Sequence, residues 1–199
     1  YAEQLGYRIK LLGITRRAND GIELRVHPTL IPEKRLIANV EGVMNAILVK
    51  GDAVGATLYY GRGAGGEPTA SAVVADLVDV ARMMTADPEH RVPHLSFQPD
   101  QLHDTPILRM EQVETGCYLR LRAFDKPGVM ADVTRILADG LISIDAILQK
   151  EAEEGEDLVD VIILTHRSVE ANVNTAIARI EALPTISAKV IRIRLEELN

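Results

Sequence analysis

From residue 117 onward, the sequence alternates between two hydrophobic periods, and this alternation limits the possible folds more than any other feature. A period of two residues, which is typical of strands, runs through 117–124, 142–151, 158–166 and 187–196. Helical periodicity runs through 129–138 and 169–183. The order β-α-β-β-α-β predicts a ferredoxin-like unit, in which two helices cover one face of a four-stranded antiparallel sheet.

Two strands of this unit show which side of the sheet is apolar. In the first strand, Leu119, Leu121 and Ala123 alternate with Tyr118, Arg120 and Arg122. In the last strand, Ile191 and Ile193 alternate with Arg192 and Arg194. We expect the apolar side to face the helices, and the more charged side to be solvated or covered by a partner domain.

The region before residue 63 predicts mostly sheet. The segments RIKLLGITRR and GIELRVHPTLIP are compatible with strands, and the NDG between them is a turn signal, so they predict a hairpin. The segment VMNAILVKGDAVGATLYYG repeats this arrangement, with Gly51, Asp52 and Gly55 at the connection. From Pro68 the period changes to that of a helix, with Val73, Leu77, Val80 and Met84 on one stripe.

Between this second hairpin and the helix, Gly61, Gly63 and Gly66 have the G-x-G-x-x-G spacing of a dinucleotide-binding loop. A primary fingerprint also needs a following strand with an acidic residue about 20 positions further on. Here the helix leads into a proline-rich segment instead. The loop is therefore either a place of close backbone approach to a ligand or a purely structural glycine turn.

Residues 86–112 contain four of the nine prolines and three of the five histidines, and they show no hydrophobic period. Proline restricts helices and removes sheet donors, so this segment predicts an extended linker. The spacing of His90, His94 and His103 matches no zinc motif, and we expect no metal site. The predicted division is one domain over 1–85, a linker over 86–116 and a second domain over 117–199.

Composition excludes several classes of protein. A net charge of -7 argues against general nucleic-acid binding, which needs an electropositive face. No apolar run approaches the roughly 20 residues that span a bilayer, so we expect a cytoplasmic protein. The single cysteine, Cys117, excludes an internal disulfide and predicts a small buried residue. The opening YAEQLGYRIK is typical of the end of a helix, and we expect a segment before it.

The turn FDKPGV joins the first strand of the C-terminal unit to its first helix. Asp125 can cap the helix, Pro127 fixes φ, and Gly128 permits a sharp change of direction. The free N–H groups of the first helical turn could bind a carboxylate. A turn with an ordinary helix cap explains the same residues equally well.

Residues 117–196 resemble an ACT domain, an amino-acid sensor attached to many biosynthetic enzymes. The resemblance is carried by the β-α-β-β-α-β order, the D-x-P-G-V turn from Asp125 to Val129, and the segment LISIDAILQKE. It implies an amino-acid effector at an interface between two such domains. The effector residues that it implies are Asp125, Gly128, Val129 and Met130, with Ser143 or Asp145 opposite.

The earlier segments GYRIKLLGI, ELRVHPTLIP, ANVEGVMNAILVKGD and TLYYGRGAGGEPTASAVVADLVDVAR resemble, in order, the later part of bacterial homoserine dehydrogenase. This resemblance implies interconversion of aspartate semialdehyde and homoserine with NAD(P)H, in threonine, isoleucine and methionine synthesis. Residues 1–85 would then be the later part of a substrate and dimerisation domain, with a helix that returns to the nucleotide domain. Gly65 would touch the cofactor, and Gly63 and Gly66 would keep its path open.

The same resemblance implies threonine as the effector and a homodimer or higher homo-oligomer. The family's catalytic lysines precede the segment that matches Tyr1, so no catalytic residue is assigned and the chain alone is expected to be inactive. Lys10 and Lys50 are interpreted as solvated strand residues, and His27 as a hydrogen-bonded structural histidine. Two alternatives remain: a non-enzymatic ACT-type sensor that oligomerises through its first region, and another ACT-containing enzyme such as an aspartate kinase.

Overall fold

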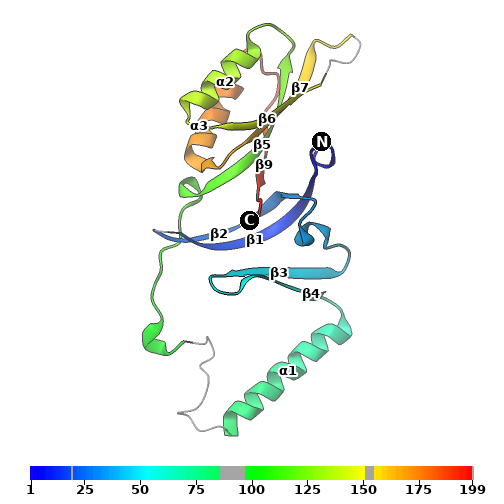
Figure 1. The fold of residues 1–199 in the computed structure, drawn as a ribbon, viewed down its shortest axis with the longest axis vertical. Helices are drawn as coiled ribbons and strands as arrows, with labels where there is room; N and C mark the ends of the chain where they lie inside the picture. The colour runs from blue at the N-terminus through cyan, green and yellow to red at the C-terminus, as the bar shows by residue number, and fades with distance from the viewer. Residues whose placement is uncertain (19, 86–96, 151–154, 199) are drawn as a thin grey trace. The chain divides into compact units, whose positions relative to one another are not determined.

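A computed structural model describes residues 1–18, 20–85, 97–150 and 155–198 (Figure 1). The chain forms two compact units. The first unit combines Tyr1–Ala38 with Thr105–Asn199, and the second consists of Asn39–Asp104. The predicted domain boundaries at residues 85 and 117 were drawn from sequence composition and not from contacts, so that division stays a prediction.

The first unit is built on a mixed sheet with the strand order β1-β2-β9-β5-β7-β6. The long strands are β1 (Tyr7–Ala18), β2 (Gly21–Pro32), β5 (Glu114–Phe124), β6 (Ile144–Gln149), β7 (Leu158–Thr165) and β9 (Ile191–Leu195). A short β8 (Ser168–Val169) pairs with the start of β5. The helices are α2 (Val129–Asp139) and α3 (Glu170–Glu181), with short 3-10 turns η1 (Glu3–Leu5), η2 (Leu36–Asn39) and η5 (Met110–Gln112).

The predicted β-α-β-β-α-β unit is confirmed. Strand β5 pairs antiparallel with β7 and with β9, and β6 pairs antiparallel with β7. Helices α2 and α3 both lie on one face of this sheet (Figure 1). The core between them consists of small and medium apolar side chains: Cys117, Leu119, Leu121, Val133, Ile136, Leu137, Ile142, Val159, Val161, Ile163, Val173, Ala176 and Ile180.

Cys117 is fully buried in this core, as predicted, and burial raises the pKa of its thiol. The opposite face of the sheet is also covered. Tyr118, Ile162 and Leu164 are buried there with Leu30 of β2, and Tyr1 and Leu5 pack against this second cluster. The more polar face is therefore covered in part by residues from the start of the same chain.

The predicted orientation of β9 is wrong. Arg192 and Arg194 stand opposite Leu119 and Cys117 in the ladder, so the two arginines share the helix side of the sheet. Ile193 packs on the other side, in the cluster around Tyr118. The physical reason is that a buried carboxylate at the start of α3 occupies the helix side of β9 and pairs with both arginines.

The first predicted hairpin is also confirmed. Strands β1 and β2 pair antiparallel from Tyr7↔Pro32 to Ala18↔Gly21, while Asn19 of the predicted turn lies outside the described residues. Strand β2 then continues the ACT-like sheet, because it pairs in parallel with β9 at Thr29↔Arg194 and Leu30↔Leu195.

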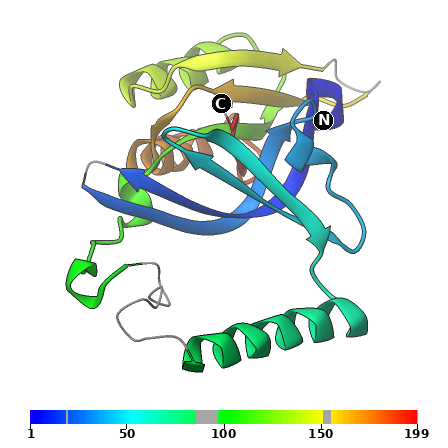
Figure 2. The same ribbon diagram turned by 60° about the horizontal axis from the view of Figure 1, so that its bottom comes forward.

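The second unit contains the second predicted hairpin and the helix. Strands β3 (Met44–Gly51) and β4 (Gly55–Arg62) pair along their whole length. Helix α1 (Gly66–Thr85) follows β4 (Figure 2), and η4 (Pro99–Gln101) comes later. None of the twenty residues of α1 is buried. Its exposed apolar side chains are Val73, Val74, Leu77, Val78, Val80 and Met84.

The linker histidines give no support to a metal site. His90 and His94 lie outside the described residues, and His103 is exposed. Among the residues that the structure describes, no three His, Cys, Asp or Glu side chains gather closely enough to hold a metal ion. None of the described helices combines the length and the apolar composition needed to cross a bilayer.

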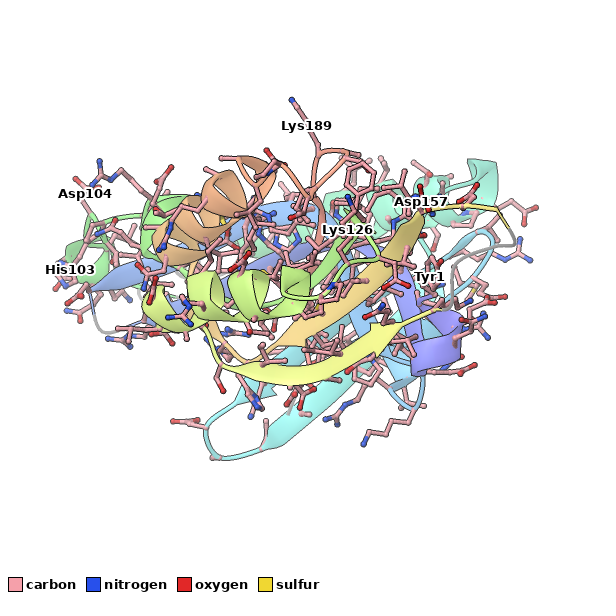
Figure 3. All side chains as sticks on the ribbon, turned by 90° about the horizontal axis from the view of Figure 1, so that it is seen from above. Tyr1, His103, Asp104, Lys126, Asp157 and Lys189 are labelled. Atoms are coloured by element: carbon pink, nitrogen blue, oxygen red, sulfur yellow. The ribbon has the colours of Figure 1, made fainter. Side chains whose placement is uncertain are left out.

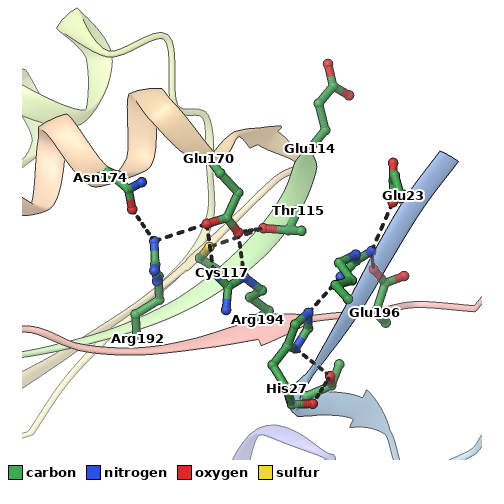
Figure 4. Close-up of polar contacts among 12 residues, drawn as sticks. Glu23, His27, Glu114, Thr115, Cys117, Glu170, Asn174, Arg192, Arg194 and Glu196 are labelled. Atoms are coloured by element: carbon green, nitrogen blue, oxygen red, sulfur yellow. Dashed lines mark hydrogen bonds and ion pairs between the residues drawn. The ribbon is translucent and has the colours of Figure 1, made fainter. Parts of the chain in front are cut away.

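Polar side chains join the β1–β2 hairpin to the rest of the first unit, and Figure 4 shows them in two groups. In the first group, the Glu170 carboxylate accepts hydrogen bonds from Arg194 Nε at 2.7 Å, Arg192 Nη1 at 3.2 Å and Thr115 Oγ1 at 2.6 Å. Glu170 is fully buried. Burial opposes its ionisation, but Arg194 and Thr115 hold the pKa of its carboxyl below the ordinary value.

The second group lies where β9 ends against the hairpin. The Glu196 carboxylate accepts a hydrogen bond from Arg16 Nη2 at 2.9 Å and another from Arg25. Glu23 lies 3.4 Å from Arg25 Nη2 and 3.6 Å from Arg16 Nη1. Burial opposes ionisation of Glu196 too, yet Arg25 and Arg16 keep the pKa of this carboxyl low.

His27 lies in the same buried row as Arg25. Its Nε2 is 3.0 Å from Arg25 Nη1, which can only donate, so Nε2 must accept and the ring must be neutral. Its Nδ1 is 3.0 Å from Thr29 Oγ1 and 3.2 Å from the carbonyl of Pro28. The prediction of a hydrogen-bonded structural histidine is therefore confirmed. We call the whole set the polar seam: Arg16, Glu23, Arg25, His27, Glu170, Arg192, Arg194 and Glu196.

The seam gives the fold a pH dependence. Burial lowers the pKa of the His27 imidazole below its ordinary value of 6.5, and Arg194 and Arg25 lower it further. The unfolded state therefore binds a proton first as the pH falls, and the contribution of His27 to stability, complete above about pH 6.5, is lost progressively below it. We expect this loss to reach at most about 1.4 kcal/mol per pH unit.

The variant His27→Gln tests this dependence, because an amide can still accept from Arg25 and donate to Thr29 but does not titrate. Urea unfolding of the wild type should show a lower free energy at pH 5.5 than at pH 7.5, whereas His27→Gln should show a smaller decrease. Equal decreases in the two proteins would contradict this role for His27.

Candidate functional site

The turn between β5 and α2 has the geometry of a small anion site. Gly128 lies at the N-cap of α2 with φ of 94°, a left-handed conformation that favours glycine. It provides no side-chain cap, so the N–H groups of the first turn have no side-chain acceptor from this position. A helix N-terminus of this kind favours negative charge through its free donors and its dipole.

Two carboxyl-bearing residues border this turn. The backbone N–H of Asp125 donates to the carbonyl of Asp157 at 2.9 Å, and its side-chain Oδ1 accepts from Gln149 Nε2 at 3.3 Å. Lys126 and Asp157 lie at the same end of the sheet (Figure 3). The exposed Asp125 carboxylate therefore stands at the edge of the helix terminus, where it can meet an ammonium group.

The other two residues at this turn, Val129 and Met130, differ in burial. Val129, the first residue of α2, is buried, with only 4% of its surface exposed. Met130 is half-buried and packs against the core under the helices. Both fix the start of α2, and the backbone N–H of Val129 donates to the Lys126 carbonyl at 3.4 Å.

Ser143 and Asp145 lie at the opposite end of β6. The Ser143 carbonyl accepts from the N–H of His166 at 2.9 Å, and the Asp145 carboxylate is 3.9 Å from His166 Nε2. Because a strand rises about 3.3 Å per residue, Asp145 lies about 13 Å along β6 from Gln149, the neighbour of Asp125. One chain thus brings Asp125, Gly128, Val129 and Met130 together but leaves Ser143 and Asp145 apart from them.

The three glycines at positions 63, 65 and 66, between β4 and α1, differ in their local constraints. Gly65 has φ of 128°, which a side chain would strain. A Cβ at Gly63 would collide with the Asn45 side chain, so Gly63 is needed for the local packing. A Cβ at Gly66 would meet nothing within 4 Å. The structural requirement for glycine is therefore clear at Gly63 and Gly65, whereas Gly66 is unconstrained by its own unit.

Lys10 and Lys50 lie on β1 and β3, as expected for strand residues. The sequence interpretation did not identify Gln149, Glu170 or Glu196. The only signal for the buried groups was the polar row Glu23, Arg25, His27 and Thr29 on alternate positions of β2, a pattern that is more often typical of a solvated face.

Two family models match separate parts of the chain. Residues 1–78 match the family model of homoserine dehydrogenase, and residues 118–184 match that of the ACT domain. Over all 199 residues, the chain is 63% identical to the homoserine dehydrogenase of Pseudomonas aeruginosa and 54% identical to that of Neisseria gonorrhoeae. It spans 46% of the length of each of these relatives.

Solved structures agree with the sequence matches. The crystal structure of a homoserine dehydrogenase from Thiobacillus denitrificans superimposes with a TM-score of 0.92 at 73% identity, covering 100% of this chain and 44% of that one. A homoserine dehydrogenase from S. aureus superimposes with a TM-score of 0.61 at 28% identity, covering 98% of this chain and 43% of that one. The chain belongs to the homoserine dehydrogenase family, whose members it matches over their C-terminal part, including an ACT domain.

Proposed function

We propose that this chain is part of an NAD(P)-dependent homoserine dehydrogenase that acts in the cytoplasm. The enzyme would interconvert aspartate semialdehyde and homoserine by hydride transfer, for the synthesis of threonine, methionine and isoleucine. The observation that carries this proposal is the uninterrupted match to homoserine dehydrogenases over both units, at 63% identity over 199 residues. A free-standing sensor would need only the ACT domain, residues 118–184.

The glycine loop is the proposed contact with the cofactor. NAD(P) would supply or accept the hydride, and Gly65 would let the backbone approach it closely. Gly65 already has a conformation that favours glycine, and the space around Gly66 is open, so the loop fits such an approach. The N-terminus of α1, which begins at Gly66, would place free N–H donors beside the phosphates.

The exposed apolar stripe of α1 supports a larger assembly. Val73, Leu77 and Met84 are 53%, 63% and 75% exposed, along one helix in which no residue is buried. In the proposed enzyme this stripe packs on the nucleotide domain, and the family's catalytic lysines precede the segment that matches Tyr1. The chain alone would therefore be inactive, and residues 1–85 would serve as the later part of the substrate and dimerisation domain.

The variant Gly66→Ala tests the cofactor contact in the complete protein. The new methyl group meets nothing in its own unit, so the fold should keep its stability, but the methyl group would stand in the cofactor's path. We expect the KM for NAD(P)H, measured with aspartate semialdehyde, to rise about tenfold, equivalent to about 1.4 kcal/mol of binding. Gly61→Ala on β4, also without neighbours within 4 Å, is the matched control and should leave the KM unchanged.

Two results would count against this reading. If both variants keep the wild-type KM, the loop does not contact the cofactor. If the complete wild-type protein neither binds NAD(P)H nor turns over aspartate semialdehyde, the dehydrogenase itself is excluded and the ACT-type sensor becomes the better account.

The start of α2 is the proposed effector site, and threonine is the proposed effector. The threonine carboxylate would accept N–H groups at Gly128 and Met130, and the Val129 N–H in place of its 3.4 Å bond to the Lys126 carbonyl. The threonine ammonium group would pair with Asp125. Ser143 and Asp145 are too far away to join this group within one chain. They would be contributed by a second copy, which makes the enzyme a homodimer or a higher homo-oligomer.

The variant Asp125→Asn tests the effector site. Loss of the carboxylate should weaken L-threonine binding to the complete protein, measured by calorimetry, about tenfold. Asp132→Asn, one helical turn along α2 from Gly128, removes an exposed carboxylate that is not among the proposed effector residues and should leave the affinity unchanged. If the wild type and both variants bind threonine with equal affinity, the effector binds elsewhere. If calorimetry detects no threonine binding to the wild type, threonine is excluded as the effector.

A further inference from the structure

The β1–β2 hairpin has its polar side buried and its apolar side exposed. Glu23 and Arg25 are each 5% exposed, whereas Leu24 and Val26 between them are 56% and 71% exposed. A hairpin held by apolar burial would show the reverse. The polar seam therefore holds residues 23–29 of the hairpin, while Leu30, near the end of β2, joins the apolar cluster around Tyr118.

A single strand carries both groups of the seam. Arg192 and Arg194 of β9 bind Glu170, and Glu196, two residues further on, binds Arg16 and Arg25 of the hairpin. Alternate residues of an extended chain share one side, so Arg192 and Arg194 of β9 and Glu196, which directly follows β9, form one continuous charged row. The row is fixed to the hairpin by the backbone as well, because the N–H of Glu196 donates to the Leu30 carbonyl at 3.0 Å.

The ACT end of this row begins at α3, which packs beside α2, the helix that starts at the proposed effector turn. Glu170 is the first residue of α3, and α3 shares the buried core with α2, through Val173 and Ile180 on one helix and Val133 on the other. Helix α2 starts at the turn proposed for the effector. A shift of α2 on effector binding would therefore reach Glu170 through closely packed side chains.

We propose that the polar seam couples the ACT domain to the β1–β2 hairpin, so that a change at α3 is transmitted through β9 to the hairpin. The hairpin lies within the segment matched by the homoserine dehydrogenase model, so the seam connects the regulatory and the enzymatic parts of the family sequence. The part of this inference that concerns an effector rests on the proposed function. The mechanical coupling itself does not.

Hydrogen–deuterium exchange of the complete protein, followed by mass spectrometry, tests the coupling without any effector. Glu170→Gln keeps the shape of the side chain and removes the charge that holds Arg192 and Arg194. We expect amides of residues 22–31, which are remote in sequence from the substitution, to exchange about tenfold faster. The proposal would be overturned if the hairpin of Glu170→Gln exchanged at the wild-type rate and faster exchange were confined to α3.

The matched control is Arg179→Gln, on the same helix. Arg179 pairs with Asp139 of α2 at 2.9 Å, but both side chains are about half exposed and neither belongs to the seam. This variant should leave exchange in the hairpin unchanged, and a tenfold increase there would overturn the proposal. If Glu170→Gln fails to fold, Arg25→Gln provides the reciprocal test, because coupling acts in both directions and should speed exchange at the start of α3.

Adding L-threonine separates this inference from the proposed effector. In the wild type, threonine should slow exchange at the start of α2 and in the hairpin. In Glu170→Gln, it should still slow exchange at α2 but no longer in the hairpin, and persistent slowing in the hairpin would overturn the proposal. Absence of any threonine effect in the wild type would instead reject the effector, while the threonine-free comparison still decides the coupling.

Discussion

The buried carboxylate of Glu170 is the constraint on which the first unit depends. It stands at the start of α3, away from water, and its oxygens are occupied by Thr115 of β5 and by Arg192 and Arg194 of β9. A buried charge without these partners would cost several kcal/mol, about 3–5 when one partner is removed. These contacts fix the start of α3 against strands β5 and β9, and β9 must turn its arginines toward the helices.

That orientation of β9 determines how the rest of the chain joins the ACT domain. With Arg192 and Arg194 on the helix side, Glu196 follows on the same side and meets the arginines of the hairpin, while Ile193 joins Tyr118 and Leu30 on the other side. The hairpin thus extends the ACT sheet through a polar seam on one face and an apolar cluster on the other. Buried ion pairs add little net stability but specify one geometry, which suits a junction between two functional parts.

The sequence predicted the elements well because they depend on local period. Both hairpins, the helix after Pro68 and the β-α-β-β-α-β order all follow from spacing within each segment. It failed at Ile191 and Ile193, because the facing of β9 was decided by Glu170, about twenty residues earlier in the chain. The Asp125 turn and the glycine loop could be located from sequence because each depends on local residue spacing. The separation of Asp145 from Asp125 could not, because it requires the register of β6.

The most direct test of this account is a double-mutant cycle across the seam in the complete protein. The free energy of unfolding would be measured for Arg25→Met, Glu196→Gln and the double variant against the wild type. A charge seam that holds the hairpin predicts a coupling energy of about 1–3 kcal/mol between these two residues. Additive effects, with a coupling energy near zero, would mean that the hairpin is held by other contacts and would contradict the account.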